Sequence, residues 1–142
     1  MPFEPIHGGC QCGAVRYTLT APPREVLHCH CSMCRKANGA LFASSGYYDV
    51  GAVRFERGEK AMRAYESSPG TDRLFCPDCG CQLFNRIAKW SDALFVMLGT
   101  LDLGALPGHD PAVERHIYWD SRVHWYDVGN DGLARSDEYS PA

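Results

Sequence analysis

The 142-residue sequence has no long hydrophobic run and no segment that reads as an export signal. No stretch approaches the roughly 18 consecutive apolar residues that a bilayer crossing needs. Residues 1–6 include neither a basic segment nor an apolar one. We therefore expect a cytoplasmic protein with no membrane partner.

The sequence also lacks an excess of positive charge. It has 14 Lys and Arg against 17 Asp and Glu, for a formal net charge of −3. Such a chain has no basic surface for a phosphate backbone, and the paired-Cys, paired-His spacing of zinc fingers is missing. Both absences argue against nucleic-acid binding.

Repeats, low-complexity tracts and linkers are absent as well. With 45% hydrophobic and 22% charged residues, the chain is long enough to build one core. We expect a single zinc-binding domain over residues 1–142, with its core at about residues 6–130 and a loosely held polar tail at 132–142.

Long helical patterns are scarce, because 14 Gly and 9 Pro cut the chain into short extended runs. This pattern predicts a mainly β protein, and its one helical turn is expected at Ser32–Asn38, before Gly39. Large aromatic residues such as Trp90, Trp119, Trp125 and Tyr126 could line a ligand pocket, but we expect them in the core. The predicted strands are 14–19, 26–31, 41–45, 53–57, 62–66, 73–76, 82–86, 94–98, 115–118 and 123–128.

Eight cysteines are present, and their spacing is the most informative feature of the chain. In a secreted protein of this size they would suggest four disulfides. In a reducing cytoplasm, cysteines two or three residues apart favour zinc, because both sulfurs can face one ion. We therefore expect two zinc sites, the second of which need not be fully occupied.

The first predicted site is closed and structural. Cys76 and Cys79 flank a tight turn followed by Gly80, which has the form of a zinc knuckle. Two thiolates do not saturate tetrahedral zinc, and Cys10 and Cys12 supply a second pair. Such a site would fix the N-terminal segment to the middle of the chain.

The second predicted site is formed by Cys29, Cys31 and Cys34, which leave the fourth zinc position to water or substrate. Three thiolates give the zinc a net negative charge, which suits it to holding a thiolate rather than to acidifying water. A bound substrate thiol could then attack an electrophilic carbon, while Arg35 and Lys36 offset the growing negative charge. We regard these five residues as the candidate catalytic group.

Two questions stay open from the sequence. Cys81 could close the second site as a fourth ligand, or it could be a separate thiol near the first site. His28 and His30 alternate with Cys29 and Cys31, so they should point away from the metal. A hydrogen-bonded structural role is expected for these histidines, with proton transfer as the alternative.

Three segments together resemble the glutathione-dependent formaldehyde-activating enzyme family, also called the centromere protein V/GFA domain. They are GCQCGAVRY at 9–17, CHCSMCRK at 29–36 and FCPDCG at 75–80. Weaker similarity at 65–68, Arg73, 116–118 and 125–126 extends the resemblance over nearly the whole chain. Cys81 departs from the family pattern, which usually has a small polar residue there.

The resemblance implies an Mss4-like (β-tent) fold of several small coiled antiparallel sheets around zinc, with both zinc sites as described. It implies a carbon–sulfur lyase that adds glutathione, or a similar small thiol, to formaldehyde or a related aldehyde. The alternative is a non-catalytic zinc-stabilised protein-binding module with two structural zinc ions. The sequence does not specify the actual thiol and aldehyde or the oligomeric state.

Overall fold

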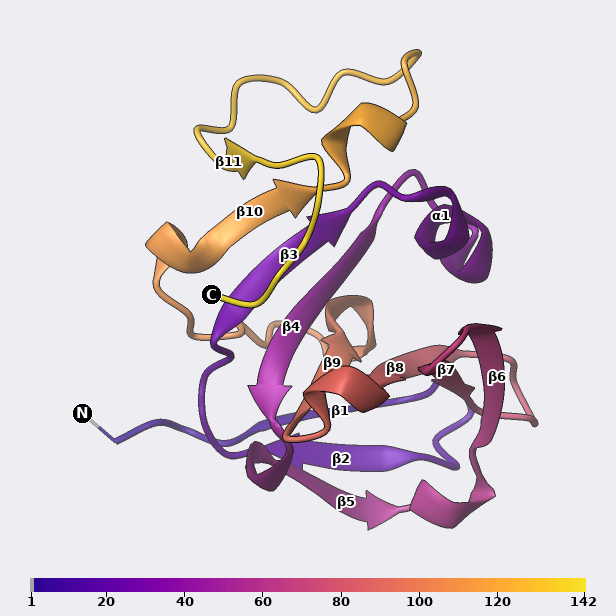
Figure 1. Cartoon of the computed structure of the whole chain (residues 1–142). Helices are drawn as coiled ribbons and strands as arrows, with labels where there is room; N and C mark the ends of the chain where they lie inside the picture. Colours follow the sequence, from indigo (N-terminus) through magenta and orange to yellow (C-terminus); the bar gives the residue numbers. More distant parts are fainter. Residues whose placement is uncertain (1) are drawn as a thin grey trace.

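Two β-sheets and one short helix make up the protein. In the computed structural model, which describes residues 2–142, the chain forms eleven strands, and these belong to a three-stranded and an eight-stranded sheet (Figure 1). The predicted mainly β class is therefore confirmed. Over residues 2–142, no helix is long and apolar enough to span a lipid bilayer.

The smaller sheet is antiparallel, in the order β1-β2-β5, and consists of β1 (Ile6–Gly9), β2 (Arg16–Leu19) and β5 (Val53–Arg57). Its first strand was not predicted, because two of its four residues are glycines. The fold requires both of them: a Cβ at Gly8 would collide with the Tyr17 hydroxyl oxygen of the neighbouring strand, and a Cβ at Gly9 would collide with the Val15 backbone oxygen. Glycine is selected here by close packing rather than by a turn.

The larger sheet has the order β11-β10-β3-β4-β9-β8-β7-β6. It is mostly antiparallel, but β10 pairs in parallel with both β3 and β11. The expectation of several small antiparallel sheets therefore understated both its size and its mixed pairing. Its strands are β3 (Glu25–Cys29), β4 (Ala43–Asp49), β6 (Arg63–Ser68), β7 (Thr71–Phe75), β8 (Gln82–Ile87), β9 (Ala93–Met97), β10 (Glu114–Ile117) and β11 (Ala134–Arg135).

The helix α1 spans Ser32–Asn38, as predicted, and ends at Gly39, whose positive φ of 56° gives the left-handed cap that glycine adopts without strain. Single 3-10 turns connect several strands. They span Val50–Ala52, Glu59–Ala61, Ala88–Trp90, Leu98–Thr100, Pro111–Val113 and Trp119–Ser121.

Two predictions for the C-terminal part are wrong. Residues 123–128 form no strand, and Trp125 there is 77% exposed rather than part of the core. The segment has strand-like composition but no strand to pair with, and composition alone does not hold a strand. The tail, expected to be loose, instead contributes β11 and places Tyr139 beside the large sheet.

Side-chain alternation along the large sheet separates two hydrophobic clusters. Even-numbered residues such as Tyr48, Phe84 and Val96 join Tyr17 of the small sheet in the first cluster. Odd-numbered residues such as Leu27 and Phe95 form the second cluster on the opposite face. Each cysteine group lies at one of these clusters.

Replacing Phe84 by Ala tests the first cluster. Its ring is fully buried and packs edge-on against Tyr17, with 5.2 Å between ring centroids. The cavity left behind should lower the free energy of unfolding by about 3–5 kcal/mol. Denaturant unfolding measures this loss. The exposed Tyr65 provides a control, since Tyr65→Ala should change it by less than about 0.5 kcal/mol. A loss at Phe84 no larger than the control would refute this packing.

Candidate metal centres and the adjoining cavity

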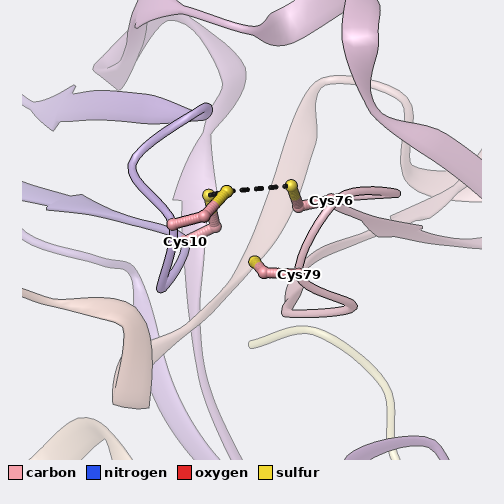
Figure 2. Close-up of side chains that lie close together, drawn as sticks. Cys10, Cys76 and Cys79 are labelled. Atoms are coloured by element: carbon pink, nitrogen blue, oxygen red, sulfur yellow. Dashed lines mark hydrogen bonds between the residues drawn. The ribbon is translucent and has the colours of Figure 1, made fainter.

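Cys10, Cys12, Cys76 and Cys79 come together as the spacing predicts. Their sulfurs all lie within 4.8 Å of one another, with Cys10 and Cys12 on the β1–β2 loop and the other pair on the β7–β8 turn (Figure 2). The Sγ of Cys12 is 3.6 Å from that of Cys10 and 3.7 Å from that of Cys76. Tetrahedral zinc with Zn–S bonds of about 2.3 Å separates its sulfurs by about 3.8 Å. The four sulfurs therefore fit one zinc ion.

Backbone N–H groups turn toward these sulfurs. The Val15 N–H donates to the Cys10 sulfur over 3.3 Å. Hydrogen bonds from the backbone N–H groups of Cys12 and then Cys81 lower the pKa of Cys79 to about 6. Gly13 and Gly80 follow the two pairs with φ of 81° and 76°, which confirms the predicted need for glycine in these turns. The loops therefore favour a thiolate at Cys79, whereas at Cys12 the backbone hydrogen bond from Ala14, which lowers the pKa, is outweighed by the neighbouring sulfurs, which raise it.

The second group consists of Cys29, Cys31 and Cys34, whose sulfurs also lie within 4.8 Å of one another. Cys29 ends β3, Cys31 is the residue before α1, and Cys34 lies in the first turn of α1. The Cys34 N–H donates to the Cys31 sulfur over 3.3 Å, which fixes the turn that gathers the three side chains. The end of β3 and the start of α1 therefore bring the three sulfurs close enough to bind one metal ion.

The protons of this group are unevenly held. Hydrogen bonding to Cys31 raises the pKa of Cys29, and the same contact lowers the pKa of Cys31. The crowded sulfurs cannot all ionise unless a cation balances their charge. A divalent metal ion supplies that charge, so the donor set fits zinc.

Arg73 is the cation that contacts this group. Its two terminal nitrogens lie 3.7 and 3.8 Å from the Cys34 sulfur, and its Nε donates to the Ser67 hydroxyl over 2.9 Å. It is only 5% exposed. In the sequence, only the family resemblance points to Arg73, because β7 is far from Cys34 along the chain.

Arg35 and Lys36, the predicted cations, lie elsewhere. The Arg35 Nε donates to the backbone oxygen of His30 over 3.3 Å, and Lys36 is exposed. Neither residue lines the cavity described below. Adjacent residues on a helix point in different directions, so following Cys34 in the sequence does not bring a side chain to its sulfur.

Cys81 lies outside both groups of sulfurs found in residues 2–142. It packs against the first hydrophobic cluster, and its Sγ lies 3.6 Å from the Gln82 backbone oxygen. The three-cysteine group borders the second cluster. The structure therefore gives Cys81 no part in closing the second site.

The two histidines next to the three-cysteine group point to the other face of the sheet, as predicted. His28 contacts Ser44 and Glu114, each at 2.7 Å, and the Nε2 of His30 lies 2.8 Å from the Nδ1 of His116. His30 and His116 are buried. These contacts show that both histidines are hydrogen-bonded on the face of the sheet opposite the three sulfurs.

A cavity of about 410 Å³ opens beside the three-cysteine group. All three cysteines line it, together with Arg73 and the buried Asn85. The rest of its wall is largely apolar and includes Leu27, Met33, Ile87, Trp90, Phe95, Ile117 and Tyr139. Three sulfurs, the cations Arg73 and Lys89 and a largely apolar wall thus meet at one place. The four-cysteine group borders a different hollow of about 570 Å³ through Cys79, and no charged side chain lines that hollow.

Comparisons with known proteins agree with this arrangement. The sequence model of the family described as glutathione-dependent formaldehyde-activating enzyme matches residues 5–121. A relative from Halomonas elongata, which carries that name provisionally, is 29% identical over an alignment of 133 residues. The alignment covers 87% of this chain and 80% of the relative. One from Phaeosphaeria nodorum with the same provisional name is 35% identical over 80 residues, or 56% of this chain and 42% of its own length.

A crystal structure of a Rhodobacter sphaeroides protein has a similar fold. It superposes with a TM-score of 0.58 at 23% sequence identity and covers 77% of this chain and 98% of its own.

Proposed function

This chain belongs to the glutathione-dependent formaldehyde-activating enzyme family, and from that premise we propose that it is a zinc-dependent carbon–sulfur lyase. Its reaction would resemble that of S-(hydroxymethyl)glutathione synthase, in which glutathione or a similar small thiol adds to formaldehyde or a related aldehyde. The observation that carries the proposal is the three-sulfur group opening into a cavity. We place this activity in the cytoplasm.

In this proposal the two cysteine groups have different roles. Cys10, Cys12, Cys76 and Cys79 hold a structural zinc, and Cys29, Cys31 and Cys34 hold the second. A zinc ion with three thiolate ligands and one open position would bind the substrate thiol and keep it ionised near neutral pH.

The reaction itself needs no oxidant or reductant. The thiol sulfur bonds to the carbonyl carbon, the π electrons of the C=O bond move to oxygen, and the proton lost by the thiol ends on that oxygen. Arg73 holds the Cys34 sulfur and supplies positive charge next to the developing alkoxide. Arg35 and Lys36 can contribute only through longer-range attraction, since they lie outside the cavity wall.

The direct test measures the formation of S-(hydroxymethyl)glutathione by NMR, with zinc-loaded protein, metal-free protein and no protein. We expect the zinc-loaded protein to exceed the spontaneous rate and the metal-free protein to lose that excess. A zinc-loaded protein that never exceeds the spontaneous rate would refute the proposed activity.

Arg73 should be a positioning residue whose loss affects rate more than folding. Arg73→Gln removes both contacts to the Cys34 sulfur and should lower kcat by about 10- to 100-fold, with a smaller change in KM. Arg73→Lys should restore part of the loss, because it keeps the charge but not the paired nitrogens. Steady-state kinetics with measured zinc content provides the readout.

Arg86→Gln is the matched control for Arg73→Gln. Arg86 lies on the adjacent strand β8, is 55% exposed and pairs with Asp72, so its loss should leave kcat unchanged. Equal kcat in the wild type and the Arg73→Gln variant, at equal zinc content, would remove Arg73 from the mechanism.

The alternative, a binding module with two closed structural zinc ions, requires a fourth protein ligand at the second site. The sulfur of Cys81 is not grouped with the other three, and the cavity lies against them. These observations favour the enzyme.

A further inference from the structure

Four aromatic side chains line the cavity, and three of them, all except Tyr118, pack against one another although they come from separate parts of the chain. Trp90 follows β8, Phe95 lies on β9, and Tyr139 comes from the tail. Tyr139 meets Trp90 edge-on, with ring centroids 5.5 Å apart at 87°, and lies 6.0 Å from Phe95. We call these three residues the aromatic wall.

Tyr139 is held firmly although it is near the C-terminus. Its hydroxyl donates to the buried carboxylate of Glu25 over 3.0 Å, and the Arg115 guanidinium lies 5.3 Å from its ring centre. In Figure 1 the C-terminal segment, drawn in yellow, passes in front of β3 on its way to the end of the chain. Tyr139 lies outside residues 5–121, the part of the chain that the family model matches.

The part of the cavity wall on β7 and β8 is polar, and it adjoins the aromatic wall because Asn85 is paired with Phe95. Arg73 and Asn85 face each other in the pairing of β7 with β8, and both line the cavity. Asn85 is 9% exposed, and its Oδ1 has no hydrogen-bond partner among the described residues. A buried acceptor without a donor is costly, and the hydroxyl formed when a thiol adds to an aldehyde would satisfy it.

Size argues for a substrate larger than formaldehyde. Formaldehyde has two heavy atoms and fills little more than one water volume, about 30 Å³, which is a small part of the cavity of about 410 Å³ and leaves space beside the bound thiol for a larger aldehyde. The charged groups of glutathione are poor occupants of the aromatic wall, because burying them without partners is unfavourable. They have a better place at the rim, where the exposed Lys89 lies 4.9 Å from the Trp90 ring centre.

We propose that the aromatic wall selects an aldehyde carrying an aromatic ring, with the ring against Trp90, Phe95 and Tyr139 and the carbonyl at the three cysteines. This inference rests on the proposed carbon–sulfur lyase activity and specifies its second substrate. Edge-to-face contacts among aromatic rings add to the gain from burial, so an aromatic group suits this wall.

The test compares benzaldehyde with formaldehyde, using glutathione and the zinc-loaded full chain. We expect a higher kcat/KM for benzaldehyde. Tyr139→Ala should lower that value about tenfold and the formaldehyde value much less, so that the selectivity ratio falls. Tyr65→Ala, an exposed tyrosine on β6 away from the cavity, should leave both values unchanged.

A binding measurement separates this inference from the proposed function. Without thiol, saturation-transfer NMR should detect benzaldehyde on the wild type and the Tyr65→Ala variant, and much more weakly on the Tyr139→Ala variant. Trp90→Leu changes the wall outside the tail and should reproduce the loss of binding. This variant separates binding by the wall from a loosening of the tail in Tyr139→Ala. Equal benzaldehyde binding to all four proteins would overturn the inference. A higher kcat/KM for formaldehyde that the Tyr139→Ala substitution does not change would also overturn it. Selective binding with no turnover of either aldehyde would refute the lyase and leave the ligand class supported.

Discussion

Cys76→Ser should abolish cooperative folding. The Cys76 side chain is fully buried in the first hydrophobic cluster, and its sulfur lies 3.7 Å from that of Cys12. Losing one ligand of a closed zinc site removes part of a binding free energy that also serves as folding free energy and that reaches about 10–16 kcal/mol for a complete structural zinc site in small peptides. Total domain stabilities are only about 5–15 kcal/mol, so the remaining interactions should not suffice.

The measurement combines thermal unfolding by circular dichroism with zinc content. The variant should show no sharp transition and should lose the structural zinc. Cys81→Ser makes the same chemical change close by, outside both cysteine groups, and should keep both the transition and the metal. A Cys76→Ser protein that unfolds at the wild-type temperature would show that this site does not hold the fold.

Cys34→Ser should have the opposite effect, with activity lost and the fold kept. The sulfur of Cys34 belongs to the three-cysteine group, which borders the second cluster and not the first. A serine hydroxyl binds zinc poorly and leaves Arg73 without the sulfur it contacts. We expect the rate of thiol-dependent aldehyde consumption to fall at least about 100-fold. Mutation of residues that only hydrogen-bond to a metal ligand already lowers metal affinity or activity by about 10- to 100-fold, and Cys34 would be a ligand itself.

Unfolding temperature and activity should be measured on the same preparation. The Cys34→Ser variant should keep a cooperative transition and about half of the zinc. Cys81→Ser again serves as the control and should keep full activity. Unchanged turnover in the Cys34→Ser variant would exclude the three-cysteine group from the chemistry.

Local spacing was enough to predict the cysteine groups. Cys76 and Cys79, like Cys29 and Cys31, are placed by the geometry of a few neighbouring residues. Strand alternation correctly predicted that the His28 side chain points away from the three sulfurs. The end of α1 followed from Gly39, because a left-handed cap favours glycine. These features depend on local backbone geometry.

Features created by pairing of distant segments could not be predicted in the same way. Arg73 reaches Cys34 only because the large sheet brings β7 near the start of α1. β11 has two residues and exists through its parallel pairing with β10. Tyr139 joins the cavity for the same reason, since its place depends on Glu25 and Trp90 and not on its neighbours in sequence.

The two cysteine groups should bind zinc differently, one as a closed site and one open to substrate. Zinc X-ray absorption on the metal-replete protein tests this difference most directly. We predict two zinc ions per chain with seven sulfur ligands between them, and one lighter atom completing the second site. Four sulfurs on each zinc, or a single zinc with four sulfurs, would contradict the account.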